Sequence, residues 1–298
     1  MSIEINLLTS EPPRHIRKPD WLRVTLPHGD DYERVKAKVK TLELNTVCKE
    51  AACPNIAECW GTGTATIMIL GDTCTRGCRF CNVKTGNPRG VIDWLEPRRV
   101  ANAVRDLNWK YLVLTAVDRD DLADGGALIF ADTVRAIHET VPGARVEILS
   151  GDYRGDVTAL DIVLDAKPDV FAHNLETVAR LSPRVRDKRA SYEQSLRILD
   201  HAKRRAPMQF TKTSLMVGLG ETIDELERAM DDARNVGVDI FTLGQYLQPS
   251  KKHLAVERFI SPDEFESIGT LARSKGFHQV VSSPLSRSSY HAEQAFLT

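Results

Sequence analysis

Residues 64–81 read TATIMILGDTCTRGCRFC, and this stretch decides both the fold and the chemistry that the chain supports. The apolar run Thr64–Leu70 has the length and composition of a buried strand. Three cysteines follow it at once in a CX3CX2C spacing, at Cys74, Cys78 and Cys81. Three thiolates in a short loop suit a cubane iron–sulfur cluster with one iron left open. Structural zinc suits this loop less well, because it normally takes four protein ligands.

A second cysteine triplet precedes this stretch. Cys48, Cys53 and Cys59 follow a CX4CX5C spacing, and the two triplets together account for all six cysteines of the chain. We interpret them as two metal clusters lying side by side. Two alternative interpretations of the cysteines remain open. They are three disulfides, and a zinc knuckle that borrows a fourth ligand.

The N-terminus and the composition bear on compartment and partners. Residues 1–6, MSIEIN, lack the charged start and apolar stretch of a secretory signal, so we expect a reducing, cytoplasmic location without disulfides. The formal net charge of −1 provides no broad attraction for nucleic acid or an anionic membrane. No apolar run approaches the roughly 18–20 residues of a membrane span. The sequence therefore predicts neither a nucleic-acid partner nor a membrane partner.

Apolar runs alternate with helix-period segments along the rest of the chain. The predicted strands are Thr64–Leu70, Tyr111–Ala116, Arg145–Leu149, Asp169–Ala172, Phe210–Val217 and Asp239–Tyr246. The predicted helices are Pro97–Leu107, Ala127–Glu139, Val157–Ala166, Tyr192–Arg205, Ile223–Val236 and Pro262–Lys275. Capping boxes are predicted where a hydroxyl precedes an acid or amide by three residues, at Ser191/Gln194, Thr222/Glu225 and Ser261/Glu264.

This alternation predicts a parallel sheet covered by helices. Six βα units indicate an α/β fold of the partial (βα)6 TIM-like barrel type better than a full eight-stranded barrel. The loop of the CX3CX2C triplet then lies at the carboxyl end of the first strand, where such barrels carry their reactive groups. A doubly wound open sheet is the alternative, but the segment 61–66 lacks the third glycine of a dinucleotide fingerprint and precedes a strand.

The CX3CX2C spacing, with Phe80 one residue before the last cysteine, resembles the radical S-adenosylmethionine superfamily. The resemblance implies that the open iron binds the amino-acid end of S-adenosylmethionine, with Phe80 near the cofactor. An electron from the cluster then cleaves a C–S bond and gives a 5′-deoxyadenosyl radical. Such radical chemistry belongs to the cofactor, and the protein supplies binding and orientation.

Further motifs resemble the lipoyl synthase family over roughly residues 40–297. They are the CX4CX5C triplet and the segments Gly71–Cys81, Leu114–Gly126, His173–Thr177, Lys212–Glu221, Gln245–His253 and Arg287–Tyr290. The resemblance implies that an octanoyl chain, amide-linked to a lysine of a carrier protein, receives sulfur at C6 and C8. Two S-adenosylmethionine molecules are spent for each product, and one of the two [4Fe–4S] clusters, the auxiliary cluster, is the consumed sulfur donor.

The same resemblance names partners and metal ligands. The implied partners are a lipoyl carrier such as the glycine cleavage H protein or a 2-oxoacid dehydrogenase E2 domain, and an electron donor such as ferredoxin or flavodoxin. The implied ligands are the CX3CX2C triplet for the radical cluster, and the CX4CX5C triplet with Ser289 for the auxiliary cluster. Serine oxygen matches soft iron poorly, so we expect this ligand to let one iron leave. The alternative is that Ser289 is a solvated tail residue.

The resemblance also divides the chain into three parts. Residues 1–62 form an N-terminal extension with the auxiliary cluster loop, residues 63–276 form the barrel, and residues 277–298 form a tail that closes the site. Cofactor contacts are expected from Asp124, Gly125, Gly126, Asn174, Glu176 and Lys212. Ordinary alternatives are a tight glycine turn, an asparagine helix cap and a surface lysine.

Two features concern the partner and the loops. Lys251 and Lys252 follow the sixth strand and are candidates for steering an acidic carrier domain, although short basic runs are usually solvated. The turn Ser150–Tyr153 reads SGDY where the resembled family has isoleucine, proline, aspartate and phenylalanine, so only Asp152 is retained.

Rival functions are a two-cluster electron carrier and a related radical sulfurase that acts on tRNA or a small molecule. Ferredoxin-type carriers use four cysteines for each cluster and shorter chains. The tail motif, and the lack of a basic extension, argue against RNA.

Overall fold

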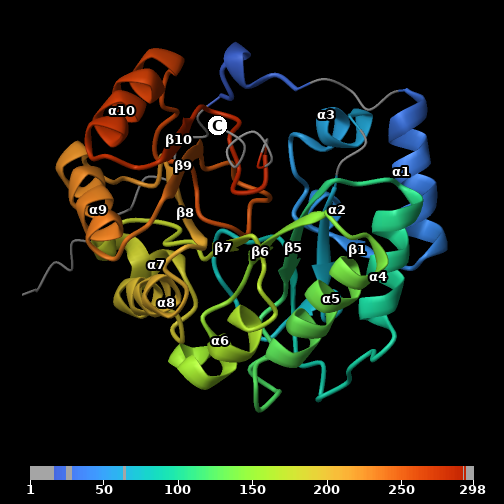
Figure 1. Ribbon diagram of the computed structural model, residues 1–298. Helices are drawn as coiled ribbons and strands as arrows, with labels where there is room; N and C mark the ends of the chain where they lie inside the picture. The colour runs from blue at the N-terminus through green and yellow to red at the C-terminus, as the bar shows by residue number, and fades with distance from the viewer. Residues whose placement is uncertain (1–16, 25–28, 63–64, 291, 293–298) are drawn as a thin grey trace, which may run out of the picture.

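Seven parallel strands and one short antiparallel strand form a sheet that curls around the centre of the molecule (Figure 1). The computed structural model describes residues 17–24, 29–62, 65–290 and 292. The strand order is β1-β2-β5-β6-β7-β8-β9-β10, and within the described residues the two edge strands do not pair, so the barrel is open. The bounds are β1 Asn45–Thr46, β2 Thr66–Ile69, β5 Tyr111–Ala116, β6 Arg145–Leu149, β7 Val170–Ala172, β8 Phe210–Val217, β9 Ile240–Gln245 and β10 Gln279–Ser282. A separate two-stranded ribbon joins β3 Thr73–Cys74 to β4 Lys84–Thr85.

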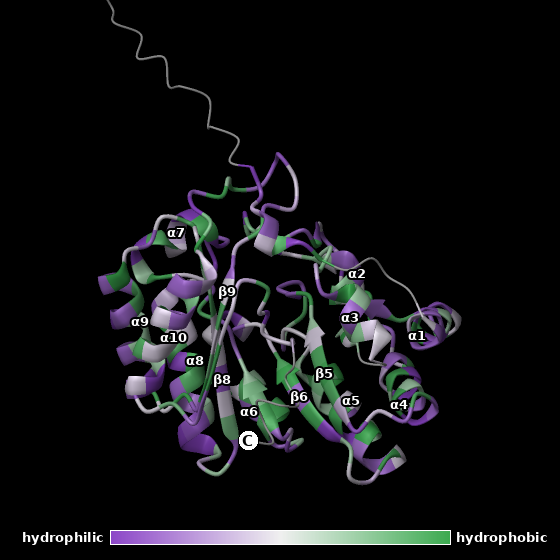
Figure 2. Ribbon diagram, turned by 90° about the horizontal axis from the view of Figure 1, so that it is seen from above, coloured by the Kyte–Doolittle hydropathy of each residue, from purple (hydrophilic) through white to green (hydrophobic). Residues whose placement is uncertain are grey.

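Helices cover the outside of this sheet, as Figure 2 shows from above. The six long ones that follow strands are α4 Glu96–Asp106, α5 Ala127–Thr140, α6 Val157–Leu164, α8 Tyr192–Arg205, α9 Ile223–Asn235 and α10 Pro262–Ser274. The others are α1 Asp30–Thr41, α2 Val47–Glu50, α3 Ile56–Gly61, α7 Ser182–Val185, and the 3-10 turns Asp20–Leu22, Tyr153–Gly155 and Ala179–Leu181. The predicted partial barrel is confirmed. No helix in the described part of the chain is long and apolar enough to cross a bilayer.

The sheet extends further at both edges than the sequence predicts. β10 adds a seventh parallel strand beside β9, within the segment assigned to the tail. β1 comes from the N-terminal extension and pairs antiparallel with β2. Both strands are short, and the residues of β10 are all partly exposed, so neither gives the apolar run that marks a buried strand. The extension and the barrel therefore share one sheet.

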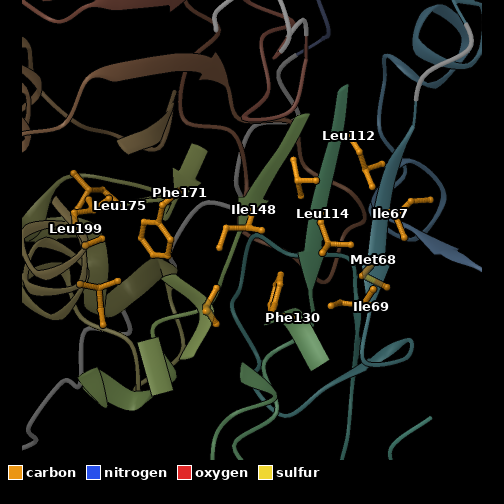
Figure 3. Close-up of a cluster of buried hydrophobic side chains, with 14 of the residues drawn as sticks. Ile67, Met68, Ile69, Leu112, Leu114, Phe130, Ile148, Phe171, Leu175 and Leu199 are labelled. Atoms are coloured by element: carbon orange, nitrogen blue, oxygen red, sulfur yellow. The ribbon is translucent and has the colours of Figure 1, made fainter. Parts of the chain in front are cut away.

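The main core lies between the outer face of the sheet and the helices. Ile67, Leu112, Leu114 and Ile148 face outward from β2, β5 and β6, and they belong to one buried apolar cluster with Phe130 of α5 (Figure 3). These side chains are nearly or completely buried. Since side chains alternate along a strand, the residues between them point to the inside of the barrel. The outer face thus supplies stability and leaves the inner face for a site.

Helix starts follow the predicted chemistry with one difference. The capping boxes at 222–225 and 261–264 form both reciprocal hydrogen bonds. Ser191 accepts from the backbone N–H of Gln194, but the Gln194 amide donates to the Arg189 carbonyl instead of reaching back to the cap. The hydroxyl alone therefore caps α8.

Gly126 is expected to be intolerant of any side chain. Its φ is +89°, and a Cβ there would lie 2.3 Å from Leu70 Cδ1. We expect Gly126→Ala to lower the free energy of unfolding by about 2–5 kcal/mol, because backbone strain adds to overpacking. Gly143 is the matched control: its φ is +94° and no atom lies within 4 Å of its Cβ position. Gly143→Ala should cost about 1–2 kcal/mol from strain alone. Denaturant titration measures both, and equal losses would contradict the packing argument.

Candidate functional site

One cavity of about 600 Å³ inside the barrel brings the two cysteine triplets together. All six cysteines line it, and so does the tail segment 286–290, which includes Ser289. The strands contribute inward-facing residues, namely Thr66, Met68, Thr115, Leu149, Ser214, Met216 and Gly244. Because the strands are parallel, the loops after them meet at one end of the barrel. The seven predicted metal ligands are therefore in one place, although they come from three parts of the chain.

The CX3CX2C loop is folded back on itself and braced from outside. The backbone N–H of Gly86 donates to the Cys74 carbonyl at 2.9 Å, beyond the β3–β4 pairing. His253 Nε2 donates to the Cys81 carbonyl at 3.0 Å, and Ser250 Oγ bonds to Nδ1 of the same ring at 2.9 Å. The segment after β9 thus holds the last cysteine of the loop in place.

The tail is anchored on the CX4CX5C segment on both sides of Ser289. The Asn55 side-chain amide donates to the Leu285 carbonyl at 2.8 Å. The Tyr290 hydroxyl donates to the Glu58 carboxylate at 2.8 Å. Asn55 and Glu58 lie between the second and third cysteines of this triplet. The tail segment that carries Ser289 is therefore anchored on the segment that carries these three cysteines.

A close backbone approach lets the tail cross the sheet. Gly244 of β9 has no side chain at the point where the Ser286 carbonyl passes, and a Cβ there would lie 2.1 Å from that oxygen. The Pro284 carbonyl also accepts from the backbone N–H of Gln245 at 3.2 Å. Glycine at this position therefore admits the tail to the cavity wall.

The thiols have the chemistry of ligands that need a cation. All six are free, and burial raises the pKa of each one, to about 12 for Cys59 and Cys78 and to about 11 for Cys74. A metal that coordinates a thiol deprotonates it outright. Within the described residues, no three Cys, His, Asp or Glu side chains converge on a single ion. Each triplet offers three thiols, which suits a cubane cluster better than structural zinc with its usual four protein ligands.

Asn174 and Glu176 line the same cavity next to the thiols. The Asn174 amide donates to Glu176 Oε1 at 3.2 Å, and Asn174 Oδ1 is buried without a hydrogen-bond partner. Glu176 has φ +67°, and burial raises the pKa of its carboxyl. A buried amide oxygen without a partner is a ready acceptor for a polar ligand. These two residues, with Phe80 on the same wall, fit the polar part of S-adenosylmethionine.

Three of the predicted cofactor contacts lie elsewhere. Asp124, Gly125 and Gly126 are not among the described residues that line the cavity. The Asp124 carboxylate accepts from the backbone N–H groups of Gly126 and Leu128, at 3.0 and 2.9 Å, and so caps α5. The ordinary alternative, a tight turn before a helix, accounts for this segment in the structure.

Lys212 also lies off the cavity wall, and the expectation that it faces the cofactor is corrected. Its Nζ donates to both oxygens of Glu147, at 2.9 and 3.1 Å, and the Tyr111 hydroxyl donates to the same carboxylate at 2.7 Å. Lys212 is only 2% exposed. It sits near the start of β8, whereas the cavity lies towards the carboxyl ends of the strands. Lys212 therefore pairs with the carboxylate of Glu147 and not with a carboxylate of a bound cofactor or substrate.

Asp118 is a cavity residue that the sequence did not single out. Its Oδ2 lies 3.9 Å from Cys74 Sγ, and burial raises its pKa to about 6. Gly151 makes room for it, because a Cβ there would lie 2.3 Å from Asp118 Oδ1. Gly151 of the altered turn therefore lies directly against the Asp118 side chain. A signal was present in the sequence, since Asp118 follows the second predicted strand.

His173 and Arg186 form a second polar group that the sequence did not predict. His173 Nδ1 donates to the Ser150 carbonyl at 2.9 Å, and Nε2 accepts from Ser195 Oγ at 2.8 Å. Arg186 in turn donates to Ser195 Oγ at 2.8 Å. Burial, reinforced by Arg186, lowers the pKa of His173 to about 4. The ring is therefore neutral and serves to fix this part of the wall.

Arg287, in the tail motif, presents a cation to the first triplet. Burial lowers the pKa of Arg287, while the nearby Cys53 opposes that change. Its Nη1 donates to the Ser286 carbonyl at 2.6 Å, and no carboxylate in the described part of the chain pairs with it. A guanidinium at this position would offset negative charge on a cluster held by the first triplet.

The chain matches two family models and has close relatives of known name. A family model described as the Radical SAM superfamily matches residues 68–233, and one described as the N-terminal domain of lipoyl synthase matches residues 4–53. The lipoyl synthase of Myxococcus xanthus (strain DK1622) is 56% identical over 281 residues, which cover 94% of each chain. The lipoyl synthase of Thermus thermophilus is 55% identical over 280 residues, which cover 94% of this chain and 87% of that one.

Solved structures share the fold at low sequence identity. SuiB of Streptococcus suis, bound to S-adenosylmethionine, superposes with a TM-score of 0.58 at 10% identity, over 76% of this chain and 53% of that one. HydG, an FeFe-hydrogenase maturase from Carboxydothermus hydrogenoformans, superposes with a TM-score of 0.56 at 14% identity, over 76% of this chain and 64% of that one. At such low identity these similarities concern the fold alone.

Proposed function

The chain belongs to the lipoyl synthase family of the radical S-adenosylmethionine superfamily, and on that premise we propose how its residues share the reaction. Enzymes of this family use S-adenosylmethionine and two [4Fe–4S] clusters to insert sulfur at C6 and C8 of a protein-bound octanoyl chain. We assign Cys74, Cys78 and Cys81 to the cluster that engages S-adenosylmethionine. The other triplet, with Ser289, holds the auxiliary cluster that gives up sulfur. What supports this assignment is the single cavity that all seven residues line.

The cavity walls suit an alkyl chain placed between the two triplets. When bound, the cofactors supply a carbon radical able to take hydrogen from an unactivated C–H bond, together with the sulfur that replaces it. The protein supplies apolar side chains along the wall, among them Val47, Met68, Leu149 and Met216. Such side chains bury the chain by the hydrophobic effect and exclude water from a reactive intermediate. The polar atoms of Asn174 and the other wall residues orient the cofactor instead.

Ser289 is proposed as the weak ligand of the auxiliary cluster. Its place is fixed by the neighbouring anchors, Asn55 to Leu285 and Tyr290 to Glu58, while its own side chain is left for the metal. An oxygen ligand holds soft iron less firmly than a thiolate does. Ser289 would therefore complete the ligand set of the cluster and would hold its iron more weakly than the three thiolates do.

The substrate is an octanoylated protein, and we propose a lipoyl carrier such as the H protein or an E2 domain. For the electron donor we propose a ferredoxin or flavodoxin. The division into extension, barrel and tail, and the cytoplasmic location, remain predictions. Both kinds of partner must reach the open end of the barrel, where the cavity lies.

Lys251 and Lys252 are expected to assist carrier binding. Both are exposed, and they follow Ser250 on the segment that braces the radical cluster loop. Reversing both charges, Lys251→Glu and Lys252→Glu, should raise the KM for an octanoylated carrier domain about 10-fold at low salt. A short octanoyl-lysine peptide lacks the domain surface and serves as the control, and its KM should not change. Unchanged carrier KM at low ionic strength would end this proposal.

The proposed function is tested on anaerobically reconstituted protein. With S-adenosylmethionine, a reductant and an octanoylated carrier, it should release 5′-deoxyadenosine and add two sulfur atoms to the carrier, as read by mass spectrometry. An electron carrier would release no 5′-deoxyadenosine. A sulfurase for RNA would release it but leave the carrier unmodified. Either result would overturn the assignment.

A further inference from the structure

Arg76 lies at the centre of the CX3CX2C loop, and three carboxylates surround its side chain. Nε and Nη2 donate to the two oxygens of Asp120, both at 2.9 Å. Nη2 also donates to Asp152 Oδ1 at 2.7 Å, and Nη1 lies 3.6 Å from Asp118 Oδ1. Arg76 is 4% exposed, and Asp152 is completely buried. A bidentate arginine–carboxylate pair fixes direction as well as distance.

The partners of Arg76 come from two other strand ends. Asp118 and Asp120 follow β5, and Asp152 follows β6, whereas Arg76 follows β2. Thr75 adds to the same junction: its backbone N–H and its hydroxyl both donate to the Asp118 carbonyl, each at 2.9 Å. The cysteine loop is thus tied to the two neighbouring loops that line the cavity.

The electrostatics show that this contact is strong. Burial alone would raise the pKa of Asp152, but the hydrogen bond and charge of Arg76 lower it to about 2. Removing the guanidinium would leave Asp118 and Asp152 without their paired cation, and Asp120 with Arg189 alone, 3.1 Å away. The cysteine loop would then lose the attraction that holds it against the wall. This change would alter the surroundings of Cys74 and Cys78 directly. Within the described residues, the hydrogen bonds and ion pairs of Arg76 involve no residue of the CX4CX5C triplet.

We propose that Arg76 is a positioning residue. It fixes the position of the CX3CX2C loop relative to the cavity wall that receives S-adenosylmethionine. The inference rests on the proposed function in one respect, namely that the CX3CX2C loop carries the radical cluster. The backbone agrees with this role. The Arg76 N–H points at Cys74 Sγ, 3.4 Å away, and the Arg76 carbonyl accepts from Thr85 Oγ1 at 3.2 Å. A side chain fixed on one side of the loop and a backbone fixed on the other leave the cysteines little freedom.

The test compares Arg76→Gln and Arg76→Lys with the control Arg119→Lys. Arg119 is also buried and paired with an aspartate, Asp121, but it binds the Leu70 and Val91 carbonyls instead of the loop. Iron content, the electron paramagnetic resonance spectrum with and without S-adenosylmethionine, and the rate of reductive cleavage are measured on each folded variant. For Arg76→Gln we expect cleavage to fall about 10- to 100-fold and the cofactor-induced spectral change to be lost, with the auxiliary signal intact. Arg76→Lys should recover part of both, and Arg119→Lys should keep both.

A milder variant covers the case in which Arg76→Gln does not fold. Asp152→Asn keeps the shape of the partner and removes its charge, and it should shift the same spectrum in the same direction. A folded Asp152→Asn or Arg76→Gln protein with unchanged spectrum and cleavage rate would overturn the role of Arg76. Failure of the proposed function is seen separately, because the unaltered chain would then release no 5′-deoxyadenosine.

Discussion

Replacing Ser289 by cysteine is expected to leave both clusters in place and to lower the yield of lipoyl product about 100-fold or more. The substituted thiolate binds iron more firmly than a hydroxyl does, so the auxiliary cluster is completed but held too well to be taken apart. The position allows the exchange, since it lies on the cavity wall between two anchored ends of the tail. Iron analysis should still give about eight irons for each chain.

Ser288→Cys is the matched control for this result. Ser288 precedes Ser289 in the same turn and lines the same cavity, but the resemblance assigns it no metal. Its variant should keep most of the activity. Mass spectrometry of the octanoylated carrier measures added sulfur, and 5′-deoxyadenosine measures the first half of the reaction. The Ser289→Cys protein should retain reductive cleavage, and product formation at the unaltered rate would refute the weak-ligand role.

The second large effect is that single cysteine substitutions should abolish the functions of the two triplets independently. Cys78→Ala removes a ligand of the radical cluster and should abolish reductive cleavage of S-adenosylmethionine. Cys53→Ala removes a ligand of the auxiliary cluster and should keep cleavage but abolish sulfur insertion. Each variant should fall from about eight to about four irons for each chain, because each triplet holds one cube. The two thiols are comparable in setting, since both are partly exposed and line the same cavity.

This pair of variants contains its own control. Each protein shows that the other triplet still folds and loads, so a lost activity is not a lost structure. Electron paramagnetic resonance with S-adenosylmethionine reports on the open iron of the radical cluster alone. If Cys53→Ala lost cleavage as fully as Cys78→Ala, the division of labour between the triplets would be wrong.

The barrel was predictable from the sequence because its signals are local. Most of the long parallel strands are rich in buried residues, and each predicted helix repeats its buried residues every three or four positions. The sequence did not predict β10, because its four residues are partly exposed and its pairing with β9 depends on the folded structure. Short strands of this kind carry little information until their neighbour is known.

The candidate site likewise contains residues that local patterns predict and residues that only long-range contacts reveal. Cysteine spacing identifies the thiols, because the ligands of one cube lie close together in the chain. The partners of Arg76 lie 44 and 76 residues away, and no local pattern links them. Lys212 shows the reverse error, since a lysine within a strand looked available until Glu147 was found beside it, 65 residues away. Buried ion pairs between strands are decided by register, which single-sequence patterns do not supply.

The anchoring of the tail has a consequence for biosynthesis. Tyr290 follows Glu58 by 232 residues, so all six cysteines leave the ribosome long before the serine that joins them. On the proposed ligand set, the radical cluster has all its protein ligands early in synthesis, whereas the auxiliary cluster still lacks its oxygen ligand. A message broken off after the barrel would yield a protein able to consume S-adenosylmethionine without making product. On that ligand set, sulfur donation has to wait until the tail segment with Ser289 has been synthesised.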